Sequence, residues 1–84
     1  MEALDGNAIG GMLYNVFGGE MTTAQVECGG CGARGPLAEC EVYLRGPGVV
    51  VRCRACHSIV MVLVEVREMI CVDLGGLREL DLPP

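Results

Sequence analysis

Apolar and polar positions follow two different periods along this chain, and the change falls near residue 20. Before that point, apolar residues recur at the spacing of an amphipathic helix, which predicts a helix within residues 1–19. Its apolar stripe consists of Leu4, Ala8, Ile9, Met12, Leu13, Val16 and Phe17. The pair Gly18-Gly19 ends the helix. Because glycines on the opposite face weaken it, its stripe must be buried, either on the chain's own sheet or in a partner or second copy.

From residue 22 the period becomes two, as in β-strands whose side chains alternate between two faces. The predicted strands cover residues 22–28, 38–44, 49–53, 59–66 and 69–74. Turns rich in glycine and proline separate them, including one at 45–48. The core behind the last strand is expected to be closed by Leu77, Leu80 and Leu82.

These elements predict a small β-rich α+β fold, in which an antiparallel sheet over residues 22–82 carries one N-terminal amphipathic helix. The sequence contains no repeat and no linker long enough to separate two units, so residues 1–84 are expected to form a single domain.

The stretch 59–64 is apolar at every position, which is typical of a central strand covered on both faces. The N-terminal helix is the expected cover on one face. In that case the chain is a monomer, and Met12 and Phe17 touch residues such as Val60 or Val62. In the alternative, the strand or the helix stripe is buried across the twofold axis of a homodimer.

Four of the six cysteines form two Cys-x-x-Cys pairs, Cys28 with Cys31 and Cys53 with Cys56. Small residues inside the pairs favour tight turns, called knuckles below, in which two thiolates point at one place. Two knuckles supply the four soft ligands of a tetrahedral structural zinc site. The intervening residues 32–52 make a spacing slightly longer than the commonest one, and the pattern still predicts a zinc ribbon with one structural zinc ion as its cofactor.

Three other interpretations of these cysteines remain open. Residues 53–57 also match the c-type haem attachment pattern, in which His57 would be an axial ligand, although no export leader opens the chain. A redox-active pair usually has a thiol at a helix N-terminus, whereas both pairs here lead into turns or strands. A rubredoxin-type iron site would use the same four thiolates, usually within a more aromatic core. We expect His57 to lie exposed beside the metal.

The remaining cysteines do not indicate catalysis. Cys40 falls on the apolar face of its predicted strand and is expected to be a buried, inert thiol, whereas Cys71 is expected to be partly exposed. His57 is the single histidine, and the sequence shows no Ser-His-acid set, phosphate loop or carboxylate pair. The protein is therefore not expected to be an enzyme.

Composition limits which residues can build the core, and net charge limits which partners the chain can bind. The chain of 84 residues has no Trp, one Phe and two Tyr, so its aliphatic core needs the support of a metal. Its net charge of −5 disfavours duplex binding, and any nucleic-acid contact is expected to be weak and centred on Arg45, Arg52 and Arg54. Without an export leader or a long apolar stretch, the sequence predicts a cytoplasmic protein with no membrane contact.

Several segments together resemble small uncharacterised zinc-ribbon proteins of high-GC actinobacterial type, over nearly the whole chain. The similarity rests on Leu4-Asp5-Gly6-Asn7-Ala8, Cys28-Gly29-Gly30-Cys31-Gly32, Cys53-Arg54-Ala55-Cys56, and Val72-Asp73-Leu74 with Gly76-Leu77. It implies a zinc ribbon with an N-terminal helix and brings no established activity. The chain departs from the family pattern at His57, where a glycine commonly ends the second knuckle, and at Gly75, where a charged residue often stands.

These features favour a non-enzymatic interaction module that docks on a protein or ribonucleoprotein machine of transcription or translation. The alternative is a zinc- or redox-responsive sensor whose ribbon unfolds when the metal is lost. Capture of a partner with and without a chelator distinguishes the two. An adaptor should reveal its partner, whereas a sensor should change its binding when the metal is removed.

Overall fold

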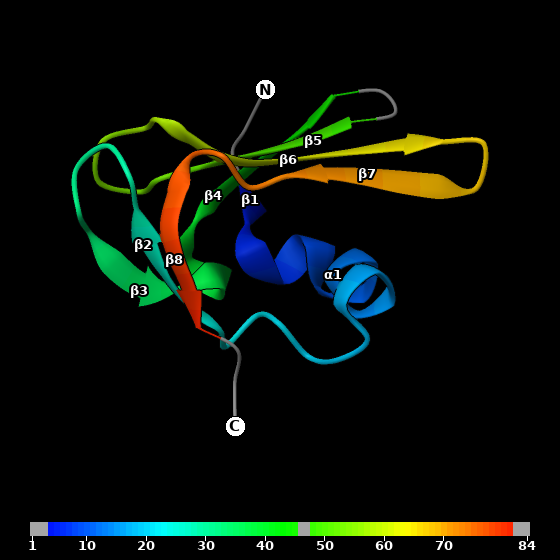
Figure 1. Cartoon of the computed structure of the whole chain (residues 1–84), viewed down its shortest axis with the longest axis horizontal. Coiled ribbons are helices and arrows are strands. Elements are labelled where there is room, and N and C mark those ends of the chain that lie inside the picture. The colour runs from blue at the N-terminus through cyan, green and yellow to red at the C-terminus, as the bar shows by residue number, and fades with distance from the viewer. Residues whose placement is uncertain (1–3, 46–47, 82–84) are drawn as a thin grey trace.

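The computed structural model describes residues 4–45 and 48–81, and these residues form two antiparallel sheets and one α-helix (Figure 1). In spatial order, the larger sheet contains β1 (Leu4–Asp5), β4 (Glu41–Arg45), β5 (Gly48–Arg52), β6 (Ile59–Val66) and β7 (Met69–Asp73). The smaller sheet contains β3 (Arg34–Pro36), β2 (Gln25–Cys28) and β8 (Leu77–Asp81). The remaining elements are the helix α1 (Gly10–Phe17) and the 3-10 turns η1 (Gly6–Ile9) and η2 (Leu37–Glu39).

The N-terminal helix is shorter than the apolar stripe predicts. Residues Leu4–Asp5 form β1 and pair with β4, residues Gly6–Ile9 form a 3-10 turn, and the α-helix begins only at Gly10. At Gly6 the chain lies directly against η2, where an added Cβ would come within 2.0 Å of the Leu37 carbonyl oxygen. Pairing with β4 and this close approach therefore prevail over the weak helix propensity of the glycine-rich start.

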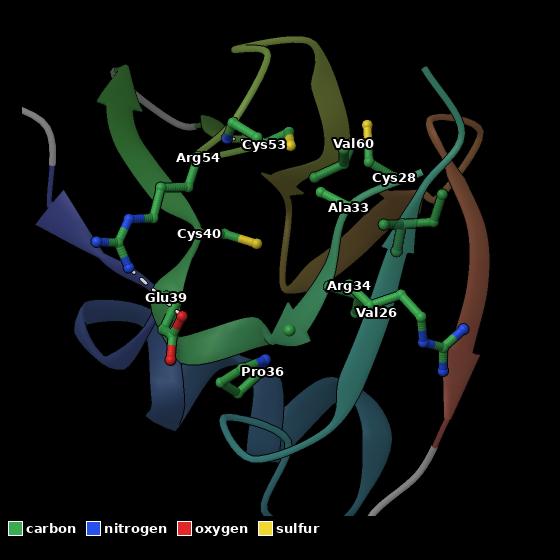
Figure 2. A pocket seen from close by; sticks show the side chains of 13 residues that line it. Val26, Cys28, Ala33, Arg34, Pro36, Glu39, Cys40, Cys53, Arg54 and Val60 are labelled. Carbon is green, nitrogen blue, oxygen red and sulfur yellow. Dashed lines mark hydrogen bonds and ion pairs between the residues drawn. The ribbon is translucent and has the colours of Figure 1, made fainter. Parts of the chain in front are cut away.

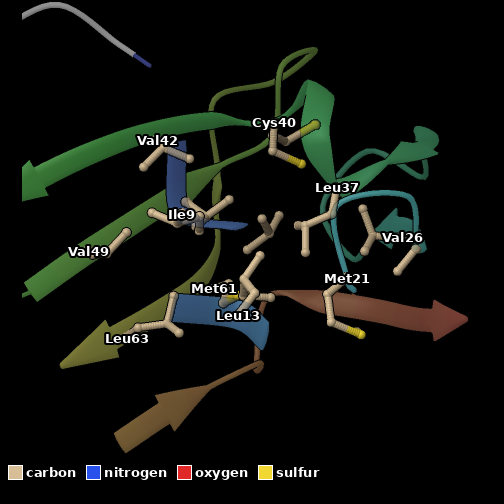
Figure 3. Close-up of a cluster of buried hydrophobic side chains, with 14 of the residues drawn as sticks. Ile9, Leu13, Met21, Val26, Leu37, Cys40, Val42, Val49, Met61 and Leu63 are labelled. Carbon is tan, nitrogen blue, oxygen red and sulfur yellow. The ribbon is translucent and has the colours of Figure 1, made fainter. Parts of the chain in front are cut away.

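Helix α1 covers the inner face of the larger sheet, as predicted. The fully buried side chains are those of Leu13, Leu37, Met61, Leu63, Val42, Val51 and Val60, and Figure 3 shows helix and sheet residues meeting in this cluster. Met12 and Phe17 pack against it from the helix. Val60 belongs to this core because the pairing of β6 with β5 shifts register at this residue, whereas Val62 lies on the other face of β6 and is only half-buried.

The single sheet expected over residues 22–82 is in fact two. The C-terminal strand β8 was not predicted from the leucine pattern, and it pairs antiparallel with β2 to build the smaller sheet. Residues 38–40 were predicted as strand, but they belong to η2 and its end, so β4 starts only at Glu41. Leu82 and the predicted turn residues Gly46 and Pro47 lie outside the described residues.

Gly76 is the point where the chain passes from the larger sheet to the smaller one. A Cβ at this position would lie 2.1 Å from the carbonyl oxygen of Ile59, so the backbone can pass only without a side chain. The Gly76 carbonyl also accepts a hydrogen bond of 2.9 Å from the N–H of Gly29, inside the first knuckle. Among the described residues, no helix is long and apolar enough to cross a membrane.

Candidate metal centre

The four cysteines predicted as metal ligands converge on one point. Their sulfur atoms all lie within 4.8 Å of one another, with 3.6 Å between Cys28 and Cys56 and 3.7 Å between Cys31 and Cys53. All four are free thiols. A tetrahedral ion with metal–sulfur bonds of about 2.3 Å requires sulfur atoms about 3.8 Å apart. The cluster therefore has the size and the donor chemistry to hold one metal ion.

The two knuckles repeat the same backbone structure. The N–H groups of Gly32 and His57 donate to the carbonyls of Cys28 and Cys53, at 2.9 and 2.8 Å, and close the two turns. The N–H groups of Gly30 and Ala55 each donate to the sulfur two residues earlier, Cys28 or Cys53, at 3.3 Å. Such N–H groups stabilise thiolates, which are the form that binds a metal.

The centre joins the two sheets. Cys28 is the last residue of β2 in the smaller sheet, while Cys53 directly follows β5 in the larger sheet. These two first cysteines of the knuckles are 3% and 6% exposed, whereas Cys31 and Cys56 lie at the surface. An ion held here would cross-link the sheets at one end, from a position that is half in the core and half at the surface.

The metal-free thiols differ in acidity. The hydroxyl and N–H groups of Ser58 donate to Cys56 and lower the pKa of its thiol to about 6. The N–H of Ala33 lowers the pKa of Cys31, but hydrogen bonding to Cys56, desolvation and the other two thiols together raise it to about 12. Cys56 therefore ionises more readily than Cys31, and Cys31 needs the metal to lose its proton. The supporting role of Ser58 has no recognisable signal in the sequence.

His57 lies beside the centre, as expected, and outside the four-sulfur cluster. Its Nδ1 atom lies 2.7 Å from the Glu41 carboxylate in β4. Its carbonyl accepts a hydrogen bond of 2.8 Å from the Arg52 guanidinium. The second knuckle is thus tied through one residue to β4 and to β5.

A cavity of about 310 Å³ opens between the two sheets next to the metal centre (Figure 2). Its apolar lining is provided by Val26, Ala33, Pro36, Val60 and Leu77, and Cys28 and Cys53 reach it from the centre. Cys40 also lines it, and burial, with the nearby Cys53 and Cys28, raises the pKa of this thiol to about 11. Cys40 is thus buried, as predicted, and its raised pKa keeps the thiol protonated.

The arginines near the centre are engaged with neighbouring groups. Arg52 stacks over the Tyr43 ring, with 5.8 Å from its guanidinium carbon to the ring centroid. Arg54 lies at the cavity mouth and pairs with Glu39 at 3.4 Å. The side chain of Arg45 lies outside what the structure describes. Cys71, in β7, is exposed.

Comparison with known proteins adds a family but no function. No curated protein and no solved structure matches the chain. A model of an uncharacterised family, described as a family of unknown function (DUF6510), matches residues 1–84. Since this match spans every residue, the chain with its four-cysteine centre belongs to the DUF6510 family.

Proposed function

We propose that this protein is a non-enzymatic adaptor of the zinc-ribbon kind, whose fold is fastened by one structural zinc ion bound to Cys28, Cys31, Cys53 and Cys56. The observation that carries the proposal is the four-sulfur cluster at the junction of the two sheets. Four thiolates fill a tetrahedral zinc ion and leave no position for a substrate, as in structural rather than catalytic zinc sites.

The cavity beside the centre supports a docking role. Its walls are apolar, and its mouth carries the charged pair Arg54 and Glu39. A volume of about 310 Å³ is small for a cofactor but accommodates an apolar side chain from a partner protein. The zinc ion would hold both walls of this cavity at a fixed distance. We place the partner in a protein or ribonucleoprotein machine of transcription or translation, with nucleic-acid contact weak or indirect because the chain is acidic.

Affinity capture with a cavity-filling variant tests this proposal. The zinc-loaded protein, the variant Ala33→Leu and the control Tyr14→Ala are used as baits at equal zinc content. A partner captured by wild type and by the control, and lost with Ala33→Leu, supports docking at the cavity. Equal capture by all three baits would show that the cavity takes no part.

A zinc- or redox-responsive sensor is the second candidate, favoured by the exposure of Cys31 and Cys56. Oxidants and chelators can reach these two ligands from solvent, and a thiol with a pKa of about 6, like that of Cys56, reacts readily as soon as the metal leaves. Treatment with peroxide separates the candidates. A sensor releases its zinc and its partner at peroxide concentrations that leave the zinc of an ordinary structural site in place.

A further inference from the structure

Cys40 borders the metal centre without belonging to the four-sulfur cluster. Its side chain is 8% exposed and points into the cavity that Cys28 and Cys53 also line (Figure 2). Among the described residues its thiol has no hydrogen-bond partner. A thiol placed in this way is available to react with a neighbouring ligand sulfur.

Cys40 lies directly opposite Cys53 in the register of the β4–β5 ladder. The last pair of this ladder is Glu41 with Arg52, so the next positions outward are the two cysteines. Neither cysteine donates its backbone N–H to the other, and side chains lie closest together in pairs of this kind. Opposite residues of an antiparallel ladder have Cα atoms about 4.5–5.5 Å apart, and disulfides span about 4.4–6.8 Å. The backbone therefore allows a disulfide between Cys40 and Cys53.

The two segments remain adjacent beyond the end of the ladder. Cys40 keeps an extended backbone, with φ −70° and ψ 155°. Glu39 and Arg54, which the same register sets opposite each other, form an ion pair at 3.4 Å. A backbone pair on one side and a side-chain pair on the other thus hold the two cysteine positions together.

We propose that Cys40 and Cys53 form a redox-modification site, at which a hydroperoxide converts the two side chains into a cross-strand disulfide. The cavity of about 310 Å³ has room for hydrogen peroxide beside both sulfurs. The thiolate of Cys53 attacks one peroxide oxygen, the O–O bond breaks, and hydroxide leaves. The Cys53 sulfur has then lost two electrons to the peroxide and is a sulfenic acid.

The Cys40 sulfur completes the reaction by attacking the Cys53 sulfur. The S–S bond forms as the S–O bond breaks, and the hydroxyl leaves as water with the proton of the Cys40 thiol. Cys28, which also lines the cavity, belongs to the smaller sheet and has no ladder position opposite Cys40. The register therefore selects Cys53 as the partner.

This disulfide removes Cys53 from the ligand set. The remaining three ligands, Cys28, Cys31 and Cys56, are too few for a closed tetrahedral zinc site, so zinc is released until the bond is reduced. The inference rests on the proposed zinc site, and it deepens the sensor candidate because it names the oxidised product.

Disulfide mapping of the full-length, zinc-loaded protein after an equimolar dose of hydrogen peroxide tests this site. Free thiols are blocked and the chain is cleaved after arginine, which places Cys40 in peptide 35–45, Cys53 in peptide 53–54 and Cys56 in peptide 55–67. Peptide 35–45 joined to peptide 53–54 should appear in step with zinc release. Zinc release with links only among the four ligands, or this link in protein that keeps its zinc, would overturn the proposal. Purified protein without zinc would refute the proposed zinc site, whereas the linked peptides would still decide whether the disulfide forms.

Two serine variants at equal zinc content serve as controls. Cys71→Ser removes an exposed thiol of β7 and should give the same linked peptides as wild type. In Cys40→Ser, peptide 53–54 should carry added oxygen or be joined to a peptide of another ligand. If wild type shows that same pattern, Cys40 takes no part and the proposal fails.

Discussion

His57 adopts in the second knuckle the left-handed backbone conformation that Gly32 adopts in the first, with φ angles of 64° and 79°. Both residues use this conformation to donate an N–H to the carbonyl of the first cysteine of their knuckle. Glycine enters this region without steric cost, whereas an L side chain costs about 1–2 kcal/mol. The contact between the His57 ring and Glu41 offsets part of that cost.

The strain at His57 predicts a ranking of variants. His57→Gly should keep the thermal stability of wild type within a few degrees, because relief of strain offsets loss of the Glu41 contact. His57→Val should lower the free energy of unfolding by about 1–2 kcal/mol, since a β-branched side chain fits this region worst. Zinc retention against a chelator, followed with thermal melts, measures both effects. A valine variant as stable as the glycine variant would refute the ranking.

Metal removal should unfold the protein. We expect about one zinc ion per chain by elemental analysis and loss of structure in a strong chelator, because binding worth about 10–16 kcal/mol is coupled to folding in small zinc domains. Iron with rubredoxin-like absorbance, or no metal, would contradict this.

The cysteines should differ in their effect on stability. Cys28→Ser and Cys53→Ser each remove a buried ligand and should abolish cooperative melting. Cys40→Ser changes only a buried thiol beside the cavity and should cost about 1–2 kcal/mol. Equal melting temperatures for all three variants would be incompatible with a fold that bound zinc stabilises.

Zinc affinity should rise with pH from about pH 6 upward. The pKa of Cys56 is lowered to about 6 by Ser58, so this thiol is largely ionised at neutral pH, whereas the pKa of Cys31 is raised to about 12. Cys31 must therefore release its proton when zinc binds, and a binding step that releases protons is favoured as pH rises. Competition with a chromophoric chelator at constant ionic strength measures the slope. An affinity independent of pH would mean that the site is already fully ionised.

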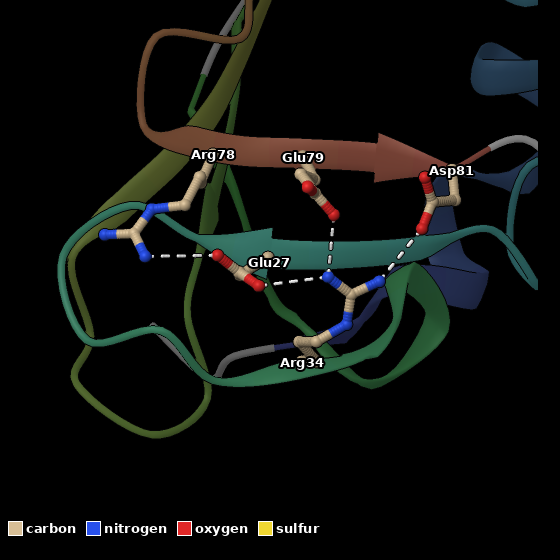
Figure 4. Close-up of polar contacts among 5 residues, drawn as sticks. All are labelled: Glu27, Arg34, Arg78, Glu79 and Asp81. Atoms are coloured by element: carbon tan, nitrogen blue, oxygen red, sulfur yellow. Dashed lines mark hydrogen bonds and ion pairs between the residues drawn. The ribbon is translucent and has the colours of Figure 1, made fainter.

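Arg34 links all three strands of the smaller sheet and should stabilise it in a salt-dependent way. Its guanidinium contacts Glu79, Asp81 and Glu27 at 2.8–3.0 Å (Figure 4). Led by Glu79, these carboxylates raise the pKa of Arg34 above its usual range, so it stays charged. Arg34→Met should lower the melting temperature at low salt, because Glu79 and Asp81 then lose their arginine beside the carboxylate of Glu27, and less so at high salt.

Arg78→Met is the matched control, since Arg78 contacts only one carboxylate of this group, Glu27, at 3.3 Å. It should lower the melting temperature less than Arg34→Met does. If the two variants behave alike at every salt concentration, the three-strand contact of Arg34 contributes nothing of its own.

Much of this fold follows from local sequence. Strand β6 has the bounds 59–66 that were predicted around the unbroken apolar run at 59–64, and the four cysteines that converge on one point were identified from their spacing alone. Both signals are local, since a Cys-x-x-Cys turn needs only small residues and a buried strand needs only apolar ones.

The two-sheet arrangement depends on contacts between distant residues. Leu77 and Leu80 in β8 do not alternate, because the pairing with β2 shifts register between Glu27 and Cys28. The acidic residues of β8 are held by Arg34, about half the chain away, so no local pattern indicates a strand. Similarly, Leu4 fits the helix stripe in sequence but pairs with Val42 in space.

The β6–β7 hairpin contains a second site of backbone strain, and relieving it should stabilise the protein. Val66 pairs with Met69, so the turn consists only of Arg67 and Glu68, whose φ angles are 49° and 70°. Two positive φ angles define the turn type that favours Asn-Gly, because its twist matches that of the flanking strands. The double change Arg67→Asn and Glu68→Gly should raise the free energy of unfolding by about 1–2 kcal/mol. Arg67→Lys with Glu68→Gln alters the side chains but leaves the backbone strain, and should melt like wild type. If this control is stabilised as much as the Asn-Gly variant, charge rather than backbone conformation limits the hairpin.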